Sequence, residues 1–289
     1  MTDAHNSIAT LGQLITLLQL EPRGVDQFQG ASEDIGTGRV FGGQVLGQAL
    51  VAACRTATSP IHSLHAYFLL PGDHHQPIDY LVERVRDGRS FATRRVVAQQ
   101  KGRTIFTMMA SFHAPEAGSF SHQHGMPPAP PPEGLRNETA LRQAQAHQLP
   151  PGWRGEKPPP IEYRMVDPVD LLHPIPRPAD IQLWLRACAA VSDDPVMHRA
   201  LLAYASDHGL LRAALLPHGL SFMQPAMRGA SLDHAMWFHR DFRIDDWLLY
   251  CIDSPSAGGA RALCRGEIYT RDGQLAVSVA QEGMLRVAV

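Results

Sequence analysis

The sequence predicts an α+β protein built from two tandem β-α-β-β-β-β repeats, each an antiparallel sheet wrapped around a central helix. The first observation behind this prediction is an internal repeat. Three blocks recur in the same order at separations of 169 to 171 residues: HAYFLLPGD from His65 and HAMWFHRDF from His234, PIDYLVERV and DWLLYCID, and RRVVAQQKG from Arg94 and RGEIYTRDG from Arg265. Three collinear matches at a nearly constant separation indicate a duplicated unit.

The second observation is the order of elements within each half. A short strand precedes a helix in both, with expected ranges of 25–30 and 41–53 in the first half and 182–187 and 195–206 in the second. Asp194 and Pro195 are a good N-cap and first helical residue. Four strands follow, with alternating apolar residues and turn signals such as the Arg-Asp-Gly that ends at Gly273. Because an antiparallel sheet curls, each helix should bury most of its surface.

A third observation separates the two halves. Most prolines gather between about residues 117 and 178, in MPPAPPPEG, LPPGW, EKPPP and HPIPRP. Proline removes a backbone donor and fixes φ, so this segment should be largely extended or irregular, with a short helix at 139–148. The predicted domains are therefore an N-terminal unit at 1–117, a proline-rich linker at 118–178 and a C-terminal unit at 179–289.

Composition excludes several classes of protein. The formal net charge is −2, and no block of like charges is present, which argues against a nucleic-acid partner. No apolar run is long enough to span a bilayer, and residues 11–20 read as an amphipathic helix rather than as a secretory signal. The 4 cysteines form no C-x-x-C pair, and the C-terminal Val-Ala-Val is no peroxisomal signal. The expectation is a cytoplasmic protein with no membrane insertion.

Motifs for metals, cofactors and serine nucleophiles are missing. There are 15 histidines but no H-E-x-x-H, and His74-His75 after Pro-Gly-Asp reads as a solvated turn. No G-x-S-x-G elbow and no phosphate-loop spacing is present. Gly42-Gly43 is interpreted as close packing at a helix start, with anion binding by its amides as the alternative. No metal and no cofactor are expected.

Asp207 is the first candidate for chemistry, because it follows the apolar run LLAYAS. If the helix continued through it, its neighbours would be Ala203, Tyr204, Leu210 and Leu211, and its face would be apolar. Two interpretations stay open. Asp207 could cap a following helix at Leu210, or it could be a buried carboxylate whose pKa desolvation would raise toward that of a useful general base.

Gln281 and Ser231 are further candidates. Gln281 is in phase with Leu275, Val277 and Val279, so a primary amide shares the strand face that should pack on the core. A register-fixing hydrogen bond and a functional role remain equally open for it. Asp233 and His234 are adjacent in a strand, and their side chains should therefore point to opposite faces.

The motifs ASEDIGTGRVFGGQVLGQAL, HAYFLLPGD, RDGRSFATRRV, ASFHAPEAG, YASD, LDHAMWFHR, DWLLY and QEGMLR resemble those of the acyl-CoA thioesterase II family, over about residues 11–286. That family has a double hotdog fold and hydrolyses fatty acyl-CoA thioesters. The resemblance implies that an Asp, a Thr and a Gln activate a water without a covalent acyl-enzyme. Asp207 and Gln281 match two of these residues, and Ser231 stands where the family has threonine. Serine keeps the hydroxyl but loses the methyl group that restricts χ1.

The resemblance also implies a medium- to long-chain acyl-CoA substrate and a homo-oligomer such as a tetramer. The predicted substrate-binding residues are Tyr204, Leu211, Phe68 and His65, with a structural role favoured for His65 as the counterpart of His234. Arginines are candidates for binding the coenzyme A phosphates by charge alone, with a salt-bridged role favoured for each: Arg94, Arg95 and Arg265. Two alternatives keep the fold. One is a non-hydrolytic acyl-CoA-binding protein, and the other is hydration or dehydration of an acyl chain by an acid and a histidine.

Overall fold

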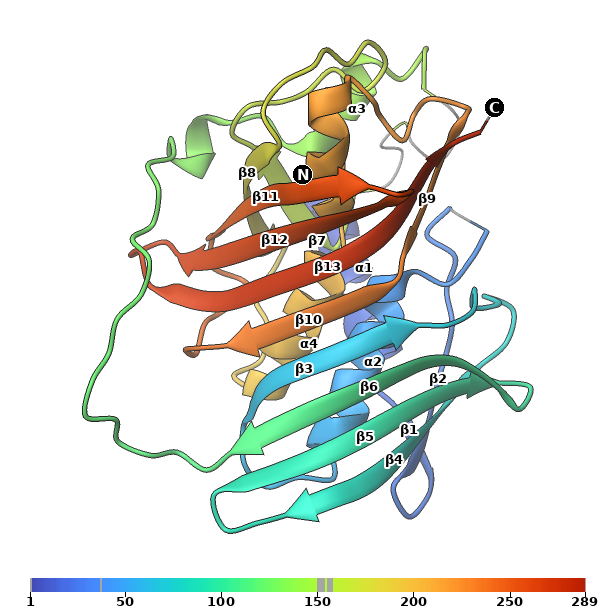
Figure 1. Ribbon diagram of the computed structural model, residues 1–289, viewed down its shortest axis with the longest axis vertical. Helices are drawn as coiled ribbons and strands as arrows, with labels where there is room; N and C mark the ends of the chain where they lie inside the picture. Colours follow the sequence, from blue (N-terminus) through green and yellow to red (C-terminus); the bar gives the residue numbers. More distant parts are fainter. Residues whose placement is uncertain (1, 37, 150–153, 155–157, 289) are drawn as a thin grey trace.

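A computed structural model describes residues 2–36, 38–149, 154 and 158–288. Its strands form one antiparallel sheet in the order β1-β2-β4-β5-β6-β3-β10-β13-β12-β11-β8-β7, with β9 paired to β13. The strands are β1 (Glu21–Gly24), β2 (Gln27–Gly30), β3 (Ile61–Phe68), β4 (Ile78–Asp87), β5 (Phe91–Gln100), β6 (Arg103–His113), β7 (Ile161–Met165), β8 (Asp180–Ala187), β9 (Met227–Ser231), β10 (Asp233–Phe238), β11 (Leu248–Gly258), β12 (Arg261–Thr270) and β13 (Leu275–Val287). Antiparallel pairing of β3 with β10 joins the two halves into a single sheet (Figure 1).

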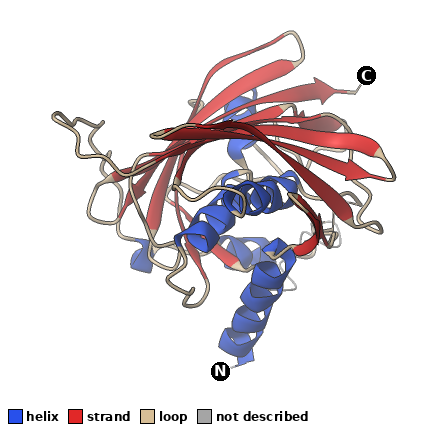
Figure 2. Cartoon of the chain, turned by 90° about the horizontal axis from the view of Figure 1, so that it is seen from below, coloured by secondary structure: helices blue, strands red, loops and turns tan. Residues whose placement is uncertain are grey.

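The sheet curves around its helices, which lie on the concave side (Figure 2). The helices are α1 (Thr2–Leu18), α2 (Gly42–Cys54), α3 (Glu138–Ala144) and α4 (Pro195–Ser206), with 3-10 helices η1 (Pro132–Gly134) and η2 (Leu210–His218). Helices α2 and α4 are the two predicted central helices, and nearly all their residues are buried. The predicted α+β fold with two helix-in-sheet repeats is thus confirmed.

Helices α2 and α4 approach each other closely because glycines line the contact. A Cβ atom on Gly43 would lie 2.4 Å from the carbonyl oxygen of Tyr204, and one on Gly47 would lie 3.0 Å from that of Ala200. Side chains at these positions would push the helices apart. The interpretation of Gly43 as a close-packing residue agrees with this geometry.

Three strands were not expected from the sequence. Strand β7 lies within residues 118–178 and pairs with β8, so part of the proline-rich segment extends the C-terminal sheet. Its buried residues Ile161, Tyr163 and Met165 alternate as a strand requires, but the surrounding prolines obscured this short pattern. Strands β1 and β9 are also short, with β1 pairing to β2 and β9 to β13.

The sequence repeat was aligned one residue out of phase across the sheet. His65 and His234 were matched, yet His65 is exposed on the outer face while His234 is fully buried on the inner face. Arg94 and Arg265 differ in the same way, with side chains 1% and 57% exposed. A slip of one residue exchanges the two faces of a strand, and weak similarity does not detect it.

No described helix is both long enough and apolar enough to cross a membrane.

Candidate active site

Asp207 lies at the C-terminal end of α4, where the helix stops. It is the C-cap residue, and Gly209, with φ of 78°, turns the chain into η2. The N-cap of η2 is Gly209 without a side-chain hydrogen bond, so the interpretation of Asp207 as a cap for that helix is wrong. The Asp207 side chain is 5% exposed and points into the space between helix and sheet.

The structure brings Asp207, Ser231 and Gln281 together. The amide Nε2 of Gln281 donates to Asp207 Oδ1 over 2.7 Å, and the Ser231 hydroxyl donates to the same oxygen over 3.4 Å. Ser231 pairs with Gly283 in the sheet, and Gly283 is two residues from Gln281 on the same face of β13. A helix end and two neighbouring strands therefore place three polar groups at one point.

The other oxygen of Asp207 faces the first turn of α2. A Cβ atom on Gly42 would stand 2.8 Å from Asp207 Oδ2 and 3.1 Å from the ring of Phe68. The first N–H groups of a helix have no partner within it, and α2 begins at Gly42 after the N-cap residue Phe41. The site is thus made by both halves, because α2 and Phe68 come from the first and Asp207 from the second.

The side-chain amide of Gln281 is hydrogen-bonded through its nitrogen but not through its oxygen. Its Nε2 also contacts Nδ1 of His234 at 3.1 Å, so both of its N–H groups have acceptors. Its Oε1 is buried and has no partner among the described residues. A buried carbonyl oxygen with a free lone pair can accept a hydrogen bond from a water molecule or a substrate.

His234 is the residue of this site that the sequence reasoning missed. It is fully buried, its Nε2 lies 3.0 Å from Ser206 Oγ, and its Nδ1 lies 4.0 Å from Asp207 Oδ1. Desolvation lowers the pKa of His234 to about 4, so the ring is neutral at pH 7. The available signal was its phase with Met236 and Phe238, the apolar positions of β10.

Asp233 does not act with His234. Its Oδ1 accepts a hydrogen bond from the backbone N–H of Glu282, on the other side of the strand. His208 also points away from Asp207, since its Nε2 contacts Glu138 and its ring stacks on Tyr163. The expectation that Asp233 and His234 point to opposite faces agrees with this geometry.

Not all of the predicted substrate-binding residues lie near the site. Phe68 lies against Gly42, and the ring centroids of Tyr204 and Phe41 are 5.0 Å apart. Both Phe68 and Tyr204 therefore border the first turn of α2. Leu211 packs against Gly283. His65 does not lie at the site, because it faces outward and contacts Trp237.

The arginines proposed from charge are all in ion pairs. Arg95 pairs with Glu83 and Arg265 with Asp253. Arg94 is buried, pairs with Asp87 and donates to backbone carbonyl groups, including that of Thr56. Its guanidinium stabilises the first half and is not available to a ligand.

In the described part of the first half, the positions that correspond to Gln281 and His234 carry apolar side chains. Ala110 pairs with Arg94 on β5 as Gln281 pairs with Cys264 on β12, so an alanine occupies the place of the amide. The corresponding residue for His234 on β3 is Leu64, which pairs with Ala110. The duplicated fold therefore carries these groups in its second half.

A cavity of about 240 Å³ lies beside η2 and α3. Its lining is mostly apolar: Leu141, Leu149, Met165, Val169, Ile181, Leu215, Leu216, Leu220, Phe222 and Met223. Two charged lining residues, Glu138 and Arg212, both contact His208, the neighbour of Asp207 in the chain. Its lining does not include Asp207, Ser231 or Gln281, so the cavity neighbours the site only by way of His208.

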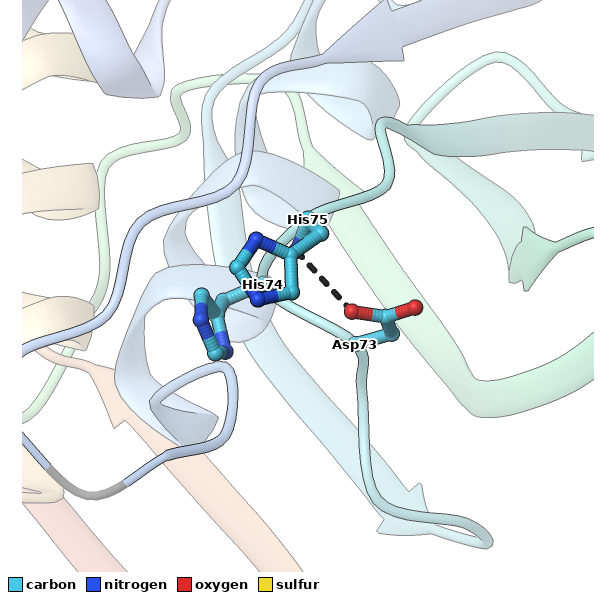
Figure 3. Close-up of side chains that lie close together, drawn as sticks. All are labelled: Asp73, His74 and His75. Carbon is cyan, nitrogen blue, oxygen red and sulfur yellow. Dashed lines mark hydrogen bonds between the residues drawn. The ribbon is translucent and has the colours of Figure 1, made fainter.

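Asp73, His74 and His75 form the described cluster that most resembles a metal site, with one ligand atom from each within 4.8 Å of the others (Figure 3). Asp73 Oδ1 accepts from the backbone N–H of His75, and Gln100 binds both the N–H and the carbonyl of Asp73. These bonds are those of an ordered surface turn, which accounts for the cluster without an ion.

Comparisons with known proteins show to which family the chain belongs. The family description "Acyl-CoA thioesterase N-terminal domain" matches residues 31–113, and "Acyl-CoA thioesterase" matches residues 173–284. Acyl-CoA thioesterase 2 of Haemophilus influenzae is 40% identical over 282 residues, covering 96% of this chain and 98% of that protein.

Solved structures agree as well. An acyl-CoA thioesterase II from Mycobacterium marinum has a TM-score of 0.78 at 45% identity, covering 95% of this chain and 98% of that one. A protein with a hot dog fold from Alicyclobacillus acidocaldarius, 19% identical, has a TM-score of 0.77 and covers 96% of this chain and 99% of its own. By its matched regions, its relatives and its fold, this chain belongs to the acyl-CoA thioesterase II family and is a thioester hydrolase with a double hotdog fold.

Proposed function

We propose that the protein hydrolyses medium- to long-chain fatty acyl-CoA thioesters with a water molecule held by Asp207, Ser231 and Gln281. The observation that carries the proposal is the polarity of the hydrogen bonds at Asp207. Gln281 and Ser231 both donate to Oδ1, which leaves Oδ2 to accept a proton from water, and Gln281 Oε1 is free to accept the second water hydrogen. Such a site accelerates hydrolysis by orienting the water molecule and by general-base catalysis.

The reaction proceeds in two steps without a covalent acyl-enzyme. Asp207 takes a proton from the water as the oxygen attacks the thioester carbonyl carbon, which gives a tetrahedral intermediate. The carbon–sulfur bond then breaks, and coenzyme A leaves as its thiol after receiving the proton from Asp207. The backbone N–H groups of Gly42 and Gly43 stabilise the oxyanion, because they begin α2 and carry the positive end of its dipole.

The proposal also says where the fatty acyl chain of the substrate binds. Phe68, Tyr204 and Leu211 supply apolar surface around the carboxylate, and the cavity beside η2 offers further apolar volume. Burial raises the pKa of Tyr204 to about 12, so its hydroxyl stays neutral beside the substrate. An apolar pocket with a few convergent polar groups is the usual form of a small-molecule site.

Thiol release from acyl-CoAs of increasing chain length tests the proposed substrate. The expected result is a kcat/KM that rises from acetyl-CoA toward medium and long chains, because each buried methylene group contributes about 0.8 kcal/mol of binding free energy. Release that is highest with acetyl-CoA would contradict the chain-length proposal. Binding of acyl-CoA without thiol release at any length would support the non-hydrolytic alternative.

Hydration or dehydration of an acyl chain is the second candidate, because His234 Nδ1 lies 4.0 Å from Asp207. Both ring nitrogens of His234 already have partners, and the ring is fully buried, which disfavours proton transfer to a substrate. An enoyl-CoA substrate distinguishes the two reactions. Formation of a 3-hydroxyacyl product would favour hydration, whereas release of free thiol would favour hydrolysis.

Substitutions of Ser231 test whether water or the serine hydroxyl is the nucleophile. If Ser231 only orients Asp207, then Ser231→Ala should lower kcat about 10-fold, the effect of one hydrogen bond to a charged group. Ser231→Thr keeps the hydroxyl and should stay within about 3-fold of wild type. A pre-steady-state burst of thiol, lost completely in Ser231→Ala, would instead indicate an acyl-serine intermediate.

Further properties stay proposals. A homo-oligomer such as a tetramer is proposed from the family, supported by exposed apolar residues on the outer sheet face, where Tyr67 lies next to the pair His65 and Met109. The division into 1–117, 118–178 and 179–289, the cytoplasmic location, and the absence of a cofactor, metal or nucleic-acid partner remain predictions from the sequence.

A further inference from the structure

We infer that His234 and Ser206 are positioning residues that fix the amide of Gln281, and through it the carboxylate of Asp207. This inference rests on the proposed role of Asp207 and Gln281 in activating water. The observation is a continuous chain of hydrogen bonds that begins in α4, crosses to β10 and β13, and returns to the end of α4 at Asp207.

The direction of each bond in this chain follows from the donors available. Gln281 Nε2 has two hydrogens and no acceptor capacity, so Nδ1 of His234 must accept one of them. Nδ1 is therefore unprotonated, and the neutral ring carries its proton on Nε2. That proton is donated to Ser206 Oγ, whose own hydrogen is donated to the carbonyl oxygen of Ala203 over 3.0 Å.

Reversing any one bond would disturb the site. If Nδ1 of His234 carried the proton, it would face an N–H of Gln281, and the amide would have to rotate away. The bond of 2.7 Å to Asp207 Oδ1 would then lengthen, and the Gln281 amide would lose its orientation toward the carboxylate. Ser206 prevents this by offering an acceptor to Nε2, which selects the tautomer.

The surroundings isolate this chain from other charges. Among the described groups that contact the His234 ring nitrogens, Asp207 carries the charge, while Ser206 and Gln281 are neutral. Tyr250 donates its hydroxyl to the carbonyl oxygen of Ser206. The ring is thus fixed from the helix and from the sheet, and it is too deeply buried to touch a substrate.

Two substitutions separate positioning from packing, one that keeps the acceptor in a smaller side chain and one that keeps most of the volume without an acceptor. His234→Asn places a carbonyl oxygen close to the position of Nδ1 and keeps an acceptor for Gln281, whereas His234→Leu fills the same space without one. We expect His234→Leu to lower kcat about 10- to 100-fold with KM within about 3-fold of wild type. His234→Asn should recover kcat to within about 3-fold.

A double-mutant cycle tests the role of Ser206. Ser206→Ala alone should lower kcat several-fold, because Nε2 loses its acceptor and the other tautomer competes. In the His234→Asn background there is no tautomer to select, so Ser206→Ala should have no further effect on kcat. Additive effects of the two substitutions would overturn the inference. This cycle also decides the matter if His234→Leu does not fold.

The experiment also includes His198→Leu as a control and Asp207→Asn as a reference variant. His198 is buried and its Nδ1 accepts from the N–H of Ile244, so His198→Leu should lower stability but leave kcat unchanged. Equal kcat losses in His234→Leu and His234→Asn would show packing rather than positioning. Unchanged kcat in His234→Leu, with activity lost in Asp207→Asn, would overturn this inference alone. Full activity in Asp207→Asn would instead overturn the proposed function.

Discussion

Replacing Asp207 with asparagine is expected to lower kcat for acyl-CoA hydrolysis by about 10²- to 10⁴-fold, the usual contribution of a general base. Asparagine keeps the size of the side chain and an oxygen that can accept from Gln281 and Ser231. It loses the basicity of the second oxygen, which faces α2 and would take the proton from water. Thiol release under saturating acyl-CoA measures this change directly.

Asp233→Asn is the matched control for this substitution. Asp233 is a partly buried carboxylate near the site, but its oxygen accepts from the backbone of Glu282 and points away from Gln281. We expect its kcat to stay near that of wild type, while binding of acyl-CoA persists in both variants. Turnover by Asp207→Asn at the rate of wild type would show that another group activates the water.

Replacing Gly43 with alanine is expected to destabilise the protein by at least about 1–3 kcal/mol, the range for overpacking of a well-packed interior. The added Cβ would stand 2.4 Å from the carbonyl oxygen of Tyr204 and 2.6 Å from the ring of Phe41. Because one of these atoms belongs to the backbone of α4, the two helices must separate. Chemical denaturation monitored by circular dichroism measures the loss in free energy of unfolding.

The same substitution should reduce activity in the molecules that remain folded. The first turn of α2 faces Asp207, so movement of α2 away from α4 increases the distance between the proposed oxyanion donors and the base. Gly12→Ala is the matched control, because a Cβ there meets nothing within 4 Å and the residue is exposed in α1. It should be neutral or stabilising by up to about 1 kcal/mol. Equal stability of the two alanine variants would contradict the close-packing argument.

The polar groups of the site were visible in the sequence because they interrupt apolar patterns. Asp207 follows a helix that is apolar on nearly all sides, and Gln281 is in phase with the apolar residues of its strand. Regular spacing within a single element was sufficient to mark both residues. The structure then showed that they contact each other, which neither pattern could indicate alone.

His234 shows where reasoning from the sequence repeat fails. The sequence match with His65 suggested a shared structural role, but the two histidines face opposite sides of the sheet. Bulges and register shifts between neighbouring strands, such as the one between Ile268 and Tyr269, change which residues are opposite each other. Weak similarity between repeats does not reveal a shift of one residue.

The sequence by itself determined the duplicated α+β architecture, the two central helices and the identity of the unusual polar residues, because these depend on spacing along the chain. The tertiary structure decided that the site is formed by both halves, that Asp207 and Gln281 contact each other, and that His234 is the acceptor for Gln281. The physical reason is that a hydrogen bond depends on distances of tenths of an ångström between segments far apart in sequence, which are set by packing of α2, α4 and the sheet.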